Sequence, residues 1–342
     1  MLQLKNNTPY KADIALFPNE KGVDTLYVTV KATFAVGESV TLAEQQEPVR
    51  LADEYQGEPG QTSLKYAADI HLSKPSTDVI VIGSAHAPGG RPVESLDVSV
   101  RVGERHKTIR VFGDRKWYRY VNDLRISPPS SFVTMPIVYE RAFGGVHATG
   151  QKTLLEPRNP VGVGFMGARG PAEMDRLPLP NLEDPAHLIG SPGDQPPPAC
   201  FGPIPPSWEP RRSFAGTYDA QWQKERAPYL PDDFQSRFVN AAHPHLAGSG
   251  YLQGGEEAII TNMTPGGIMS FTLPSCGFDV SVQIGGETER PAMNLETVLI
   301  EPDELRFSLV WRGCVECDKK PLKVSQVTVA VKGAGSEGEE DA

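Results

Sequence analysis

Several carboxylates in the middle of the chain have the residue types needed for acid–base chemistry. Asp232 and Asp233 are adjacent, and Glu140, Asp184 and Asp219 occur in the same region. Paired carboxylates can serve as the acid and the base of a hydrolase that acts on carbohydrate or peptide. Carboxylates at turns and helix starts are far more often caps that accept hydrogen bonds from exposed backbone amides. The sequence therefore favours a protein that is not an enzyme, with a hydrolase as the alternative.

The pair Cys314-Val-Glu-Cys317 has a spacing that can bind zinc or support redox exchange. Structural zinc normally requires a full tetrahedral set of ligands, and the sequence has neither a second Cys-x-x-Cys pair nor a His-x-x-x-His pair. A redox pair is expected at the start of a helix, whereas Asp-Lys-Lys-Pro, which is typical of a turn, follows this one. These features favour two reduced cysteines at a hairpin over a metal site or a redox site.

Sequence motifs of common catalytic and nucleotide-binding sites are also missing from the chain. It has no Gly-x-Ser-x-Gly nucleophile elbow, no His-Glu-x-x-His pair and no Walker loop. We therefore expect no catalytic residue, no bound metal and no cofactor.

Aromatic residues next to arginines form a more informative pattern. Tryptophan, tyrosine and arginine dominate the anchors of protein interfaces because they combine a large buried area with directed hydrogen bonds. The alternative, favoured for Arg115 and Arg141, is that arginines bond carbonyl groups of irregular backbone that no sheet satisfies. The residues expected to bind a partner are Trp117, Tyr139, Arg141, Phe143, Trp208, Arg211, Trp222 and Phe234.

Most of these residues lie in an unusual stretch between Pro128 and Asn240. It holds 19 of the 32 prolines, interspersed with aromatic residues, arginines and carboxylates. A disordered proline-rich linker is poor in aromatics because it has no core to bury them. This composition instead predicts an ordered irregular segment that is stiffened by proline and pinned by buried rings. Long ordered irregular segments are usually functional, so we expect the functional surface of the protein to lie in this segment.

Two β-rich regions flank this segment. The 33 glycines and 32 prolines in 342 residues argue against a mostly helical chain, and the only plausible helix is Tyr218–Arg226 with Asp219 near its start. Alternating or β-branched runs predict strands at 25–36, 78–83, 96–102, 107–112 and 114–120, the last of which should continue the sheet. Further strands are predicted at 256–262, 267–273, 278–284, 293–300, 304–311 and 322–331.

The predicted fold is therefore mainly β, with two sheet lobes of sandwich or open-barrel type, a long irregular segment between them and little helix. The expected boundaries are residues 1–127 for the first lobe, 128–245 for the irregular segment packed on the lobes, 246–332 for the second lobe and 333–342 for a disordered acidic tail.

The charge of the chain limits its partners. The net charge is −10, and four acidic residues with no basic residue lie in the segment 333–342. An acidic chain without a basic run binds nucleic acid and anionic membranes poorly. No apolar run approaches the roughly 20 residues of a membrane helix, and the N-terminal residues lack the pattern of a secretory signal. We expect a cytoplasmic protein.

Short blocks of residues follow one another in a specific order along the chain, and most of them lie in the proline-rich stretch. The blocks are Asn7-Thr8-Pro9-Tyr10, Val30-Lys31-Ala32-Thr33-Phe34, Asp69 with Lys74-Pro75-x-x-Asp78, Gly113-Asp114-Arg115-x-Trp117, Met135-Pro136-x-x-Tyr139-Glu140-Arg141-Ala142-Phe143-Gly144-Gly145, Asn159-Pro160-x-Gly162-x-Gly164-Phe165, Leu179-Pro180-Asn181-Leu182-Glu183, Phe201-Gly202-Pro203-Ile204 with Trp208 and Arg211, Tyr218-Asp219-x-x-Trp222, and Pro231-Asp232-Asp233-Phe234. In this order the blocks resemble the DUF2169 family, which is found in type VI secretion gene clusters, and the resemblance covers roughly residues 2 to 330.

The resemblance implies a non-enzymatic adaptor or chaperone that loads effectors. Such a protein would hold a type VI secretion effector, often one with a PAAR domain, and help to place it on the VgrG spike. A structural component that is itself secreted with the spike is a further alternative. The blocks contain no catalytic residue to carry over, and Cys314 and Cys317 belong to none of them.

Overall fold

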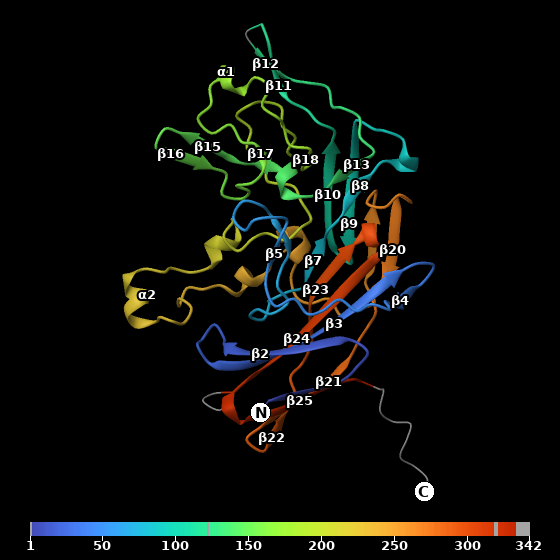
Figure 1. Ribbon diagram of the computed structural model, residues 1–342, viewed down its shortest axis with the longest axis vertical. Helices are drawn as coiled ribbons and strands as arrows, with labels where there is room; N and C mark the ends of the chain where they lie inside the picture. The colour runs from blue at the N-terminus through green and yellow to red at the C-terminus, as the bar shows by residue number, and fades with distance from the viewer. Residues whose placement is uncertain (1, 122, 318–320, 333–342) are drawn as a thin grey trace.

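The computed structural model describes residues 2–121, 123–317 and 321–332 (Figure 1). The chain is mainly β, as the sequence predicted, and its helices are all short. Within these residues, no helix has both the length and the apolar character required to cross a membrane. The acidic tail expected at 333–342 lies outside the described residues.

The largest sheet has the strand order β2-β3-β24-β23-β7, with β4 paired to β3. Its interior strand β3 is rich in β-branched and aromatic residues and is buried along most of its length. β24 runs antiparallel to β3, and β23 runs parallel to β7. The strands are β2 Lys11–Pro18, β3 Asp24–Val36, β4 Val40–Leu42, β7 Asp78–Val81, β23 Asn294–Glu301 and β24 Arg306–Glu316.

A second sheet has five strands in the order β18-β10-β9-β19-β20. β9 and β10 form a hairpin around Gly103, whose φ of 55° is a left-handed conformation that glycine adopts without strain. Every second residue of β10 is buried, which places one face of this sheet on the core. The strands are β9 Ser95–Val102, β10 Arg105–Phe112, β18 Leu182–Glu183, β19 Glu257–Thr261 and β20 Ile268–Thr272.

The third sheet joins the two ends of the described chain. Its order is β1-β25-β21-β22, and β1 pairs in parallel with β25. Each of the three large sheets thus contains strands from both 1–127 and 246–332. The two predicted β-rich regions share their sheets and do not form one sheet each. The strands are β1 Gln3–Asn7, β21 Phe278–Ile284, β22 Glu287–Glu289 and β25 Val324–Val331.

The strongly alternating runs of the sequence are confirmed as strands, with boundaries shifted by a few residues. One expectation is wrong, because residues 114–120 do not continue the main sheet. Only β11 (Trp117–Tyr120) is a strand there, and in the described residues it pairs with β12 (Asp123–Ile126) alone. The backbone of this hairpin turns away because Trp117 is buried in a separate cluster of side chains.

The central segment 128–245 contains only short elements, as its composition predicted. The expected helix is confirmed as α2 (Ala220–Glu225). Short strands there and in the N-terminal region are β5 Glu54–Tyr55, β6 Leu64–Tyr66, β8 Ser84–His86, β13 Thr134–Pro136, β14 Phe143–Gly144, β15 Val146–Thr149, β16 Lys152–Leu155 and β17 Val163–Gly164. Short helices are α1 Pro171–Met174, α3 Pro244–Ala247, and the 3-10 helices η1 Pro88–Gly90, η2 Tyr139–Arg141, η3 Arg211–Phe214, η4 Ser236–Val239, η5 Pro302–Glu304 and η6 Pro321–Lys323.

Two hydrophobic clusters hold these parts together. The main core fills the space between the large sheets and includes Phe201, Ile204 and Trp208 of the central segment. The smaller cluster lies among α1, β11 and β14, at the top of Figure 1, and is built from Trp117, Phe143, Met174, Leu179 and Ile189. Buried rings therefore pin the proline-rich segment at two places.

Candidate functional site

Four of the eight residues predicted to bind a partner lie inside the protein. Trp117 and Phe143 belong to the smaller cluster, and Tyr139 and Trp208 belong to the main core. The rings of Tyr139 and Trp208 pack edge to face with their centroids 5.4 Å apart. All four side chains are buried, so in this conformation they hold irregular backbone in place and do not reach the surface.

The other four predicted residues keep accessible surface. Arg211 and Phe234 line the same cavity, whereas Trp222 lies on α2 and Arg141 lines a separate cleft. The structure therefore brings together two of the eight predicted residues at an accessible site.

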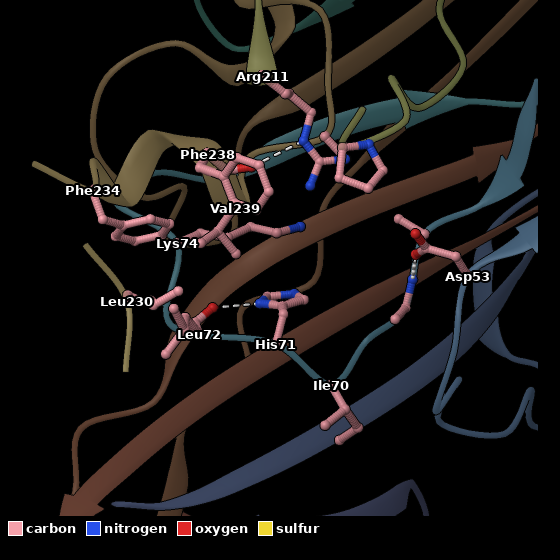
Figure 2. Close-up of a pocket in the computed structure, with 14 residues that line it drawn as sticks. Asp53, Ile70, His71, Leu72, Lys74, Arg211, Leu230, Phe234, Phe238 and Val239 are labelled. Atoms are coloured by element: carbon pink, nitrogen blue, oxygen red, sulfur yellow. Dashed lines mark hydrogen bonds between the residues drawn. The ribbon is translucent and has the colours of Figure 1, made fainter. Parts of the chain in front are cut away.

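That site, which we call the Arg211 cavity, has a volume of about 400 Å³ (Figure 2). Residues 67–74 of the N-terminal region form one side, and residues 206–241 of the central segment form the other. Leu230, Phe234 and Phe238 supply an apolar wall. A mostly apolar lining with a few fixed polar groups is typical of a binding pocket.

The guanidinium of Arg211 is the main polar group of this cavity. Its Nε donates to the carbonyl oxygen of Phe238 at 2.9 Å, and its Nη1 donates to that of Ile204 at 2.5 Å. Within the described residues, no carboxylate lies within 4.0 Å of Arg211, and its Nη2 has no hydrogen-bond acceptor. Burial lowers the pKa of Arg211, but an arginine remains charged in proteins. A cation without a close counter-ion in an apolar wall is suited to an anionic or carbonyl ligand.

Arg211 also lines a second cavity of about 530 Å³. Phe214, Arg237 and Asn240 contribute to that cavity, and the guanidinium of Arg237 stacks 3.9 Å above the ring of Phe214. The side chain of Arg211 therefore lies between two cavities, each lined by the central segment and by other parts of the chain.

His71 and Lys74 face the cavity from the N-terminal side. Burial lowers the pKa of His71 well below its ordinary value, and the nearby cations Lys74 and Arg312 act in the same direction. The ring is therefore neutral at neutral pH. Its Nδ1 lies 2.7 Å from Nη1 of Arg312 and 2.5 Å from the carbonyl oxygen of Leu72, and the tautomer decides which of the two it bonds. Nζ of Lys74 lies 2.8 Å from Asp78, which already balances its charge.

A buried carboxylate, that of Glu296, lies behind this side of the cavity. Burial raises the pKa of Glu296 to about 7, although Arg312 and Lys74 lower it in part. Oε2 of Glu296 lies 4.0 Å from Nε of Arg312, and neither atom has a hydrogen-bond partner among the described residues. Glu296 therefore changes its protonation near neutral pH, and Arg312 connects it to His71 in the cavity wall.

An arm formed by residues 214–235 adjoins the Arg211 cavity and carries α2, which stands away from the sheets in Figure 1. Asp219 caps α2 by accepting a hydrogen bond from the backbone amide of Trp222 at 2.8 Å. Nε1 of Trp222 donates to the carbonyl oxygen of Tyr229 at 2.9 Å, and Nε of Arg226 donates to that of Leu230 at 2.9 Å. These bonds tie the helix to the returning chain and fix the shape of the arm.

The arm presents aromatic rings to solvent. Tyr218 is 54% exposed and Tyr229 is 42% exposed. Tyr218 packs edge to face against Trp222, with their centroids 4.7 Å apart. Nη2 of Arg226 donates to the carbonyl oxygen of Glu20 at 3.2 Å and so attaches the arm to the β2–β3 turn. Exposed rings in fixed positions are the type of anchor that protein interfaces use.

The carboxylates considered for catalysis are all engaged in structural contacts. Caps and ion pairs of this kind stabilise loops, and each engages at least one oxygen of the carboxylate. The contacts are Glu140 accepting from Ser63, Asp184 pairing with Lys107, Asp219 capping α2, Asp232 pairing with Arg226 and Asp233 accepting from Thr217.

The Cys-x-x-Cys pair lies at the end of β24. Cys314 is exposed, Cys317 is buried, and both thiols are free. Burial raises the pKa of Cys317, which disfavours the thiolate that a metal or a redox reaction needs. In the part of the chain that the structure describes, no group of three or more His, Cys, Asp or Glu side chains is placed to hold a metal ion.

The N-terminal side of the Arg211 cavity was not selected from the sequence. Asp53 and His71 lie in no motif with a known chemical role. A signal was nevertheless present, because Lys74 and Asp78 belong to one of the resemblance blocks and are four residues apart. Their buried ion pair now fixes the loop that ends at Lys74, and Asp69 of the same block pairs with the buried Lys31 at 2.8 Å.

Comparison with known protein families gives a match over most of the chain. The model of a family described as "Uncharacterized protein conserved in bacteria (DUF2169)" matches residues 21–312. The matched region contains the three large sheets in part, the Arg211 cavity and the arm. No curated protein and no solved structure matches the chain.

Proposed function

The chain belongs to the DUF2169 family, an uncharacterized bacterial family, and we propose that it is a non-enzymatic adaptor of type VI secretion. In this role it binds an effector in the cytoplasm, through the PAAR domain or the N-terminal region of that effector, and helps to load it onto the VgrG spike. The type VI assignment follows from the resemblance of the ordered sequence blocks. The protein-binding role is supported independently by the surface of the central segment.

The observation that carries the proposal is the aromatic arm. Tyr218, Trp222 and Tyr229 lie on a short projecting element whose backbone is fixed by internal hydrogen bonds. Because these rings are already held in place, binding would lose little conformational entropy. Rigid anchors of this kind at the surface are what an adaptor needs to hold its partner.

The Arg211 cavity adds a second contact beside the arm. Phe234 belongs to both, since it lies in residues 214–235 and lines the cavity. An apolar side chain of the effector would fill the space against Phe234 and Phe238, and a carbonyl or carboxylate group would accept from Arg211. The cavity thus offers the hot-spot geometry of an apolar pocket with one directed donor.

The hydrolase alternative draws no support from the five carboxylates on which it depended. Each of them accepts from a loop amide or hydroxyl, or pairs with a cation. The other alternative, a structural component secreted with the spike, differs from the adaptor in where the protein ends up. Detection of the chain in culture supernatant as well as in cells would favour that alternative.

Co-purification with the effector encoded beside it tests the proposal. The tagged chain is expressed with the full effector and, in parallel, with the effector lacking its PAAR or N-terminal region. Recovery of the full effector but not of the truncated one is expected. Equal recovery of both would rule out the proposed binding region, and recovery of neither would contradict the adaptor role.

A further inference from the structure

The second cavity that Arg211 lines is found at the base of the arm. Its volume of about 530 Å³ is within the range of pockets that enclose a ligand. Phe214, the first residue of the arm, and Arg237, which follows the arm, both line this cavity, and neither lines the Arg211 cavity. The short helices η3 and η4, which carry these two residues, pack against each other. We call this space the Arg237 cavity.

The charges around the Arg237 cavity do not balance. Its lining holds two arginines, Arg211 and Arg237, and no carboxylate of the described residues. Within the same part of the chain, no carboxylate lies within 4.0 Å of either guanidinium. Asp53 and Asp78 attract Arg211 from farther away, but Asp78 is paired with Lys74 at 2.8 Å. Even if Asp53 is assigned to Arg211, the charge of Arg237 remains unbalanced.

The acidic residues closest in sequence to these two arginines have other partners. Glu209 lies 3.4 Å from Arg212. Asp233 accepts hydrogen bonds from the backbone amide of Thr217 at 2.9 Å and from its hydroxyl at 2.7 Å. An anion from outside the chain therefore fits Arg237 better than these carboxylates do.

The guanidinium of Arg237 is already held in the orientation that binds a carboxylate. It stacks 3.9 Å above the ring of Phe214. Its Nε and Nη2 both donate to Oε1 of Gln235, at 2.9 and 2.7 Å. A carboxylate binds to arginine through two parallel hydrogen bonds of this kind, which are about twice as strong as bonds to a neutral acceptor. The neutral amide of Gln235 belongs to an exposed side chain, so a charged acceptor can displace it.

The walls of the cavity are largely apolar. Ile204, Ala242, Pro210 and Pro244 contribute to them. Proline has no backbone N–H, so these walls offer few donors to the main chain of a peptide that passes through the cavity. Apolar walls beside a fixed guanidinium suit a ligand whose carboxylate and apolar group lie close together.

We propose that the Arg237 cavity binds the C-terminal residue of a partner polypeptide, with its α-carboxylate on Arg237 and an apolar side chain against Phe214 and Ile204. A C-terminal residue carries both groups on one Cα, whereas an internal acidic residue would need a neighbouring residue to supply the apolar group. Capture of a terminal carboxylate is a recurring mode of peptide recognition. Because Arg237 and Phe214 do not line the Arg211 cavity, this site does not rest on the adaptor role.

The test uses the full chain and the fluorescein-labelled peptide Gly-Ser-Gly-Ser-Gly-Leu with a free C-terminus, in fluorescence anisotropy titrations at low salt. The same peptide with a C-terminal amide should bind at least about tenfold more weakly, a loss of about 1.4 kcal/mol. Arg237→Gln should weaken binding of the free acid by a similar factor, because it removes the charged donor. Its unfolding temperature should stay the same, since Arg237 is exposed.

Two further variants locate the site. Phe214→Leu keeps an apolar side chain and removes the ring under the guanidinium, so it should weaken binding about threefold. The matched control is Arg212→Gln, which removes an arginine of the same helix η3 that is 65% exposed and lines neither cavity. This control should bind the peptide as the wild type does.

Three outcomes would overturn the proposal: no binding of the free acid to the wild type, equal binding of the acid and the amide, and an equal loss in Arg237→Gln and Arg212→Gln. The amidated peptide Gly-Ser-Glu-Leu-Gly places the carboxylate inside the chain, and binding as tight as that of the free acid would contradict the C-terminal assignment. Acetyl-leucine should compete less well than the unlabelled peptide. Equal competition would show that the ligand is a small carboxylic acid and not a polypeptide.

Discussion

Nε1 of Trp222 donates a hydrogen bond to the carbonyl oxygen of Tyr229 at 2.9 Å and so closes the arm on itself. The bond joins α2 to the part of the arm that follows the helix. The ring of Trp222 also packs against the exposed ring of Tyr218. The position of the exposed rings therefore depends on an internal contact within the arm.

Substitution of Trp222 by phenylalanine keeps an aromatic ring and removes the N–H donor. Loss of one such hydrogen bond costs about 1 kcal/mol, which corresponds to roughly fivefold more frequent opening of the arm. We expect trypsin to cut after Lys224 or Arg226 several times faster in Trp222→Phe than in the wild type. The unfolding temperature of the whole protein should stay the same, because α2 buries no residue of the core. Unchanged cleavage rates would mean that this bond does not fix the arm.

The buried pair of Arg115 and Glu183 holds loop backbone near the smaller cluster. Arg115→Ala leaves a buried carboxylate unpaired, so we expect it to lower the free energy of unfolding by about 3 kcal/mol. The double variant Arg115→Met/Glu183→Met should recover part of that loss in urea unfolding, because it also removes the buried charge. If the double variant is no more stable than Arg115→Ala, the pair does not act as a unit.

Gly113 lies where a side chain has no space. A Cβ added there would come within 1.7 Å of the carbonyl oxygen of Ser130, so the backbone would have to move. Gly113→Ala should therefore lower the free energy of unfolding by roughly 3 kcal/mol or more. The matched control is Gly193→Ala, since a Cβ at Gly193 meets no atom within 4 Å, and its effect should be within about 0.5 kcal/mol. Similar stabilities of the two variants in chemical denaturation would contradict this packing.

The pKa of Glu296 gives a pH dependence with a definite sign. Burial raises it from 4.5 to about 7, so the folded protein holds a proton that the unfolded chain has released. The stability that this proton contributes is complete below pH 4.5 and is lost as the pH rises to about 7.

Glu296→Gln cannot ionise and lacks this dependence. Relative to the wild type, the variant should therefore gain stability between pH 4.5 and pH 8, by up to roughly 3 kcal/mol. The measurement is urea unfolding of both proteins at several pH values. A stability difference that does not vary with pH would contradict the raised pKa of Glu296.

Much of the fold could be predicted from local pattern. The β-branched alternation of residues 25–36 marks the interior strand β3, and Asp219 marks the start of α2 because a carboxylate there caps exposed amides. The edge strands β1 and β2 were missed, since their sequences QLKNN and KADIALFP contain polar residues and proline at partly exposed positions.

The sharing of sheets between the two ends of the chain could not be predicted. Periodicity reports which face of a strand is buried, but it does not identify the neighbouring strand. The parallel pairing of β1 with β25 and the antiparallel pairing of β3 with β24 connect residues about 300 positions apart. Only tertiary packing selects these partners.

The candidate site was predicted in part for a related reason. Neighbouring tryptophan and arginine residues occur at protein interfaces. They also occur where arginines bond the carbonyl groups of irregular loops. Trp117 and Trp208 proved to be core residues, whereas Trp222 and Phe234 keep accessible surface. Sequence alone does not separate these cases, because burial depends on which distant segments cover the ring.

Effector capture by an arm variant tests the central claim most directly. The tagged wild type and the variant Tyr218→Ala/Trp222→Ala are each expressed with the neighbouring effector, and the bound effector is quantified. The control is Tyr120→Ala, which removes a ring that is 50% exposed on the β11–β12 hairpin, away from the arm. If the arm binds the effector, the arm variant should recover at least about tenfold less of it than the wild type does, with an unchanged unfolding temperature. The control should recover the wild-type amount. Equal recovery by the wild type and the arm variant would contradict the proposal that this arm is the effector-binding surface.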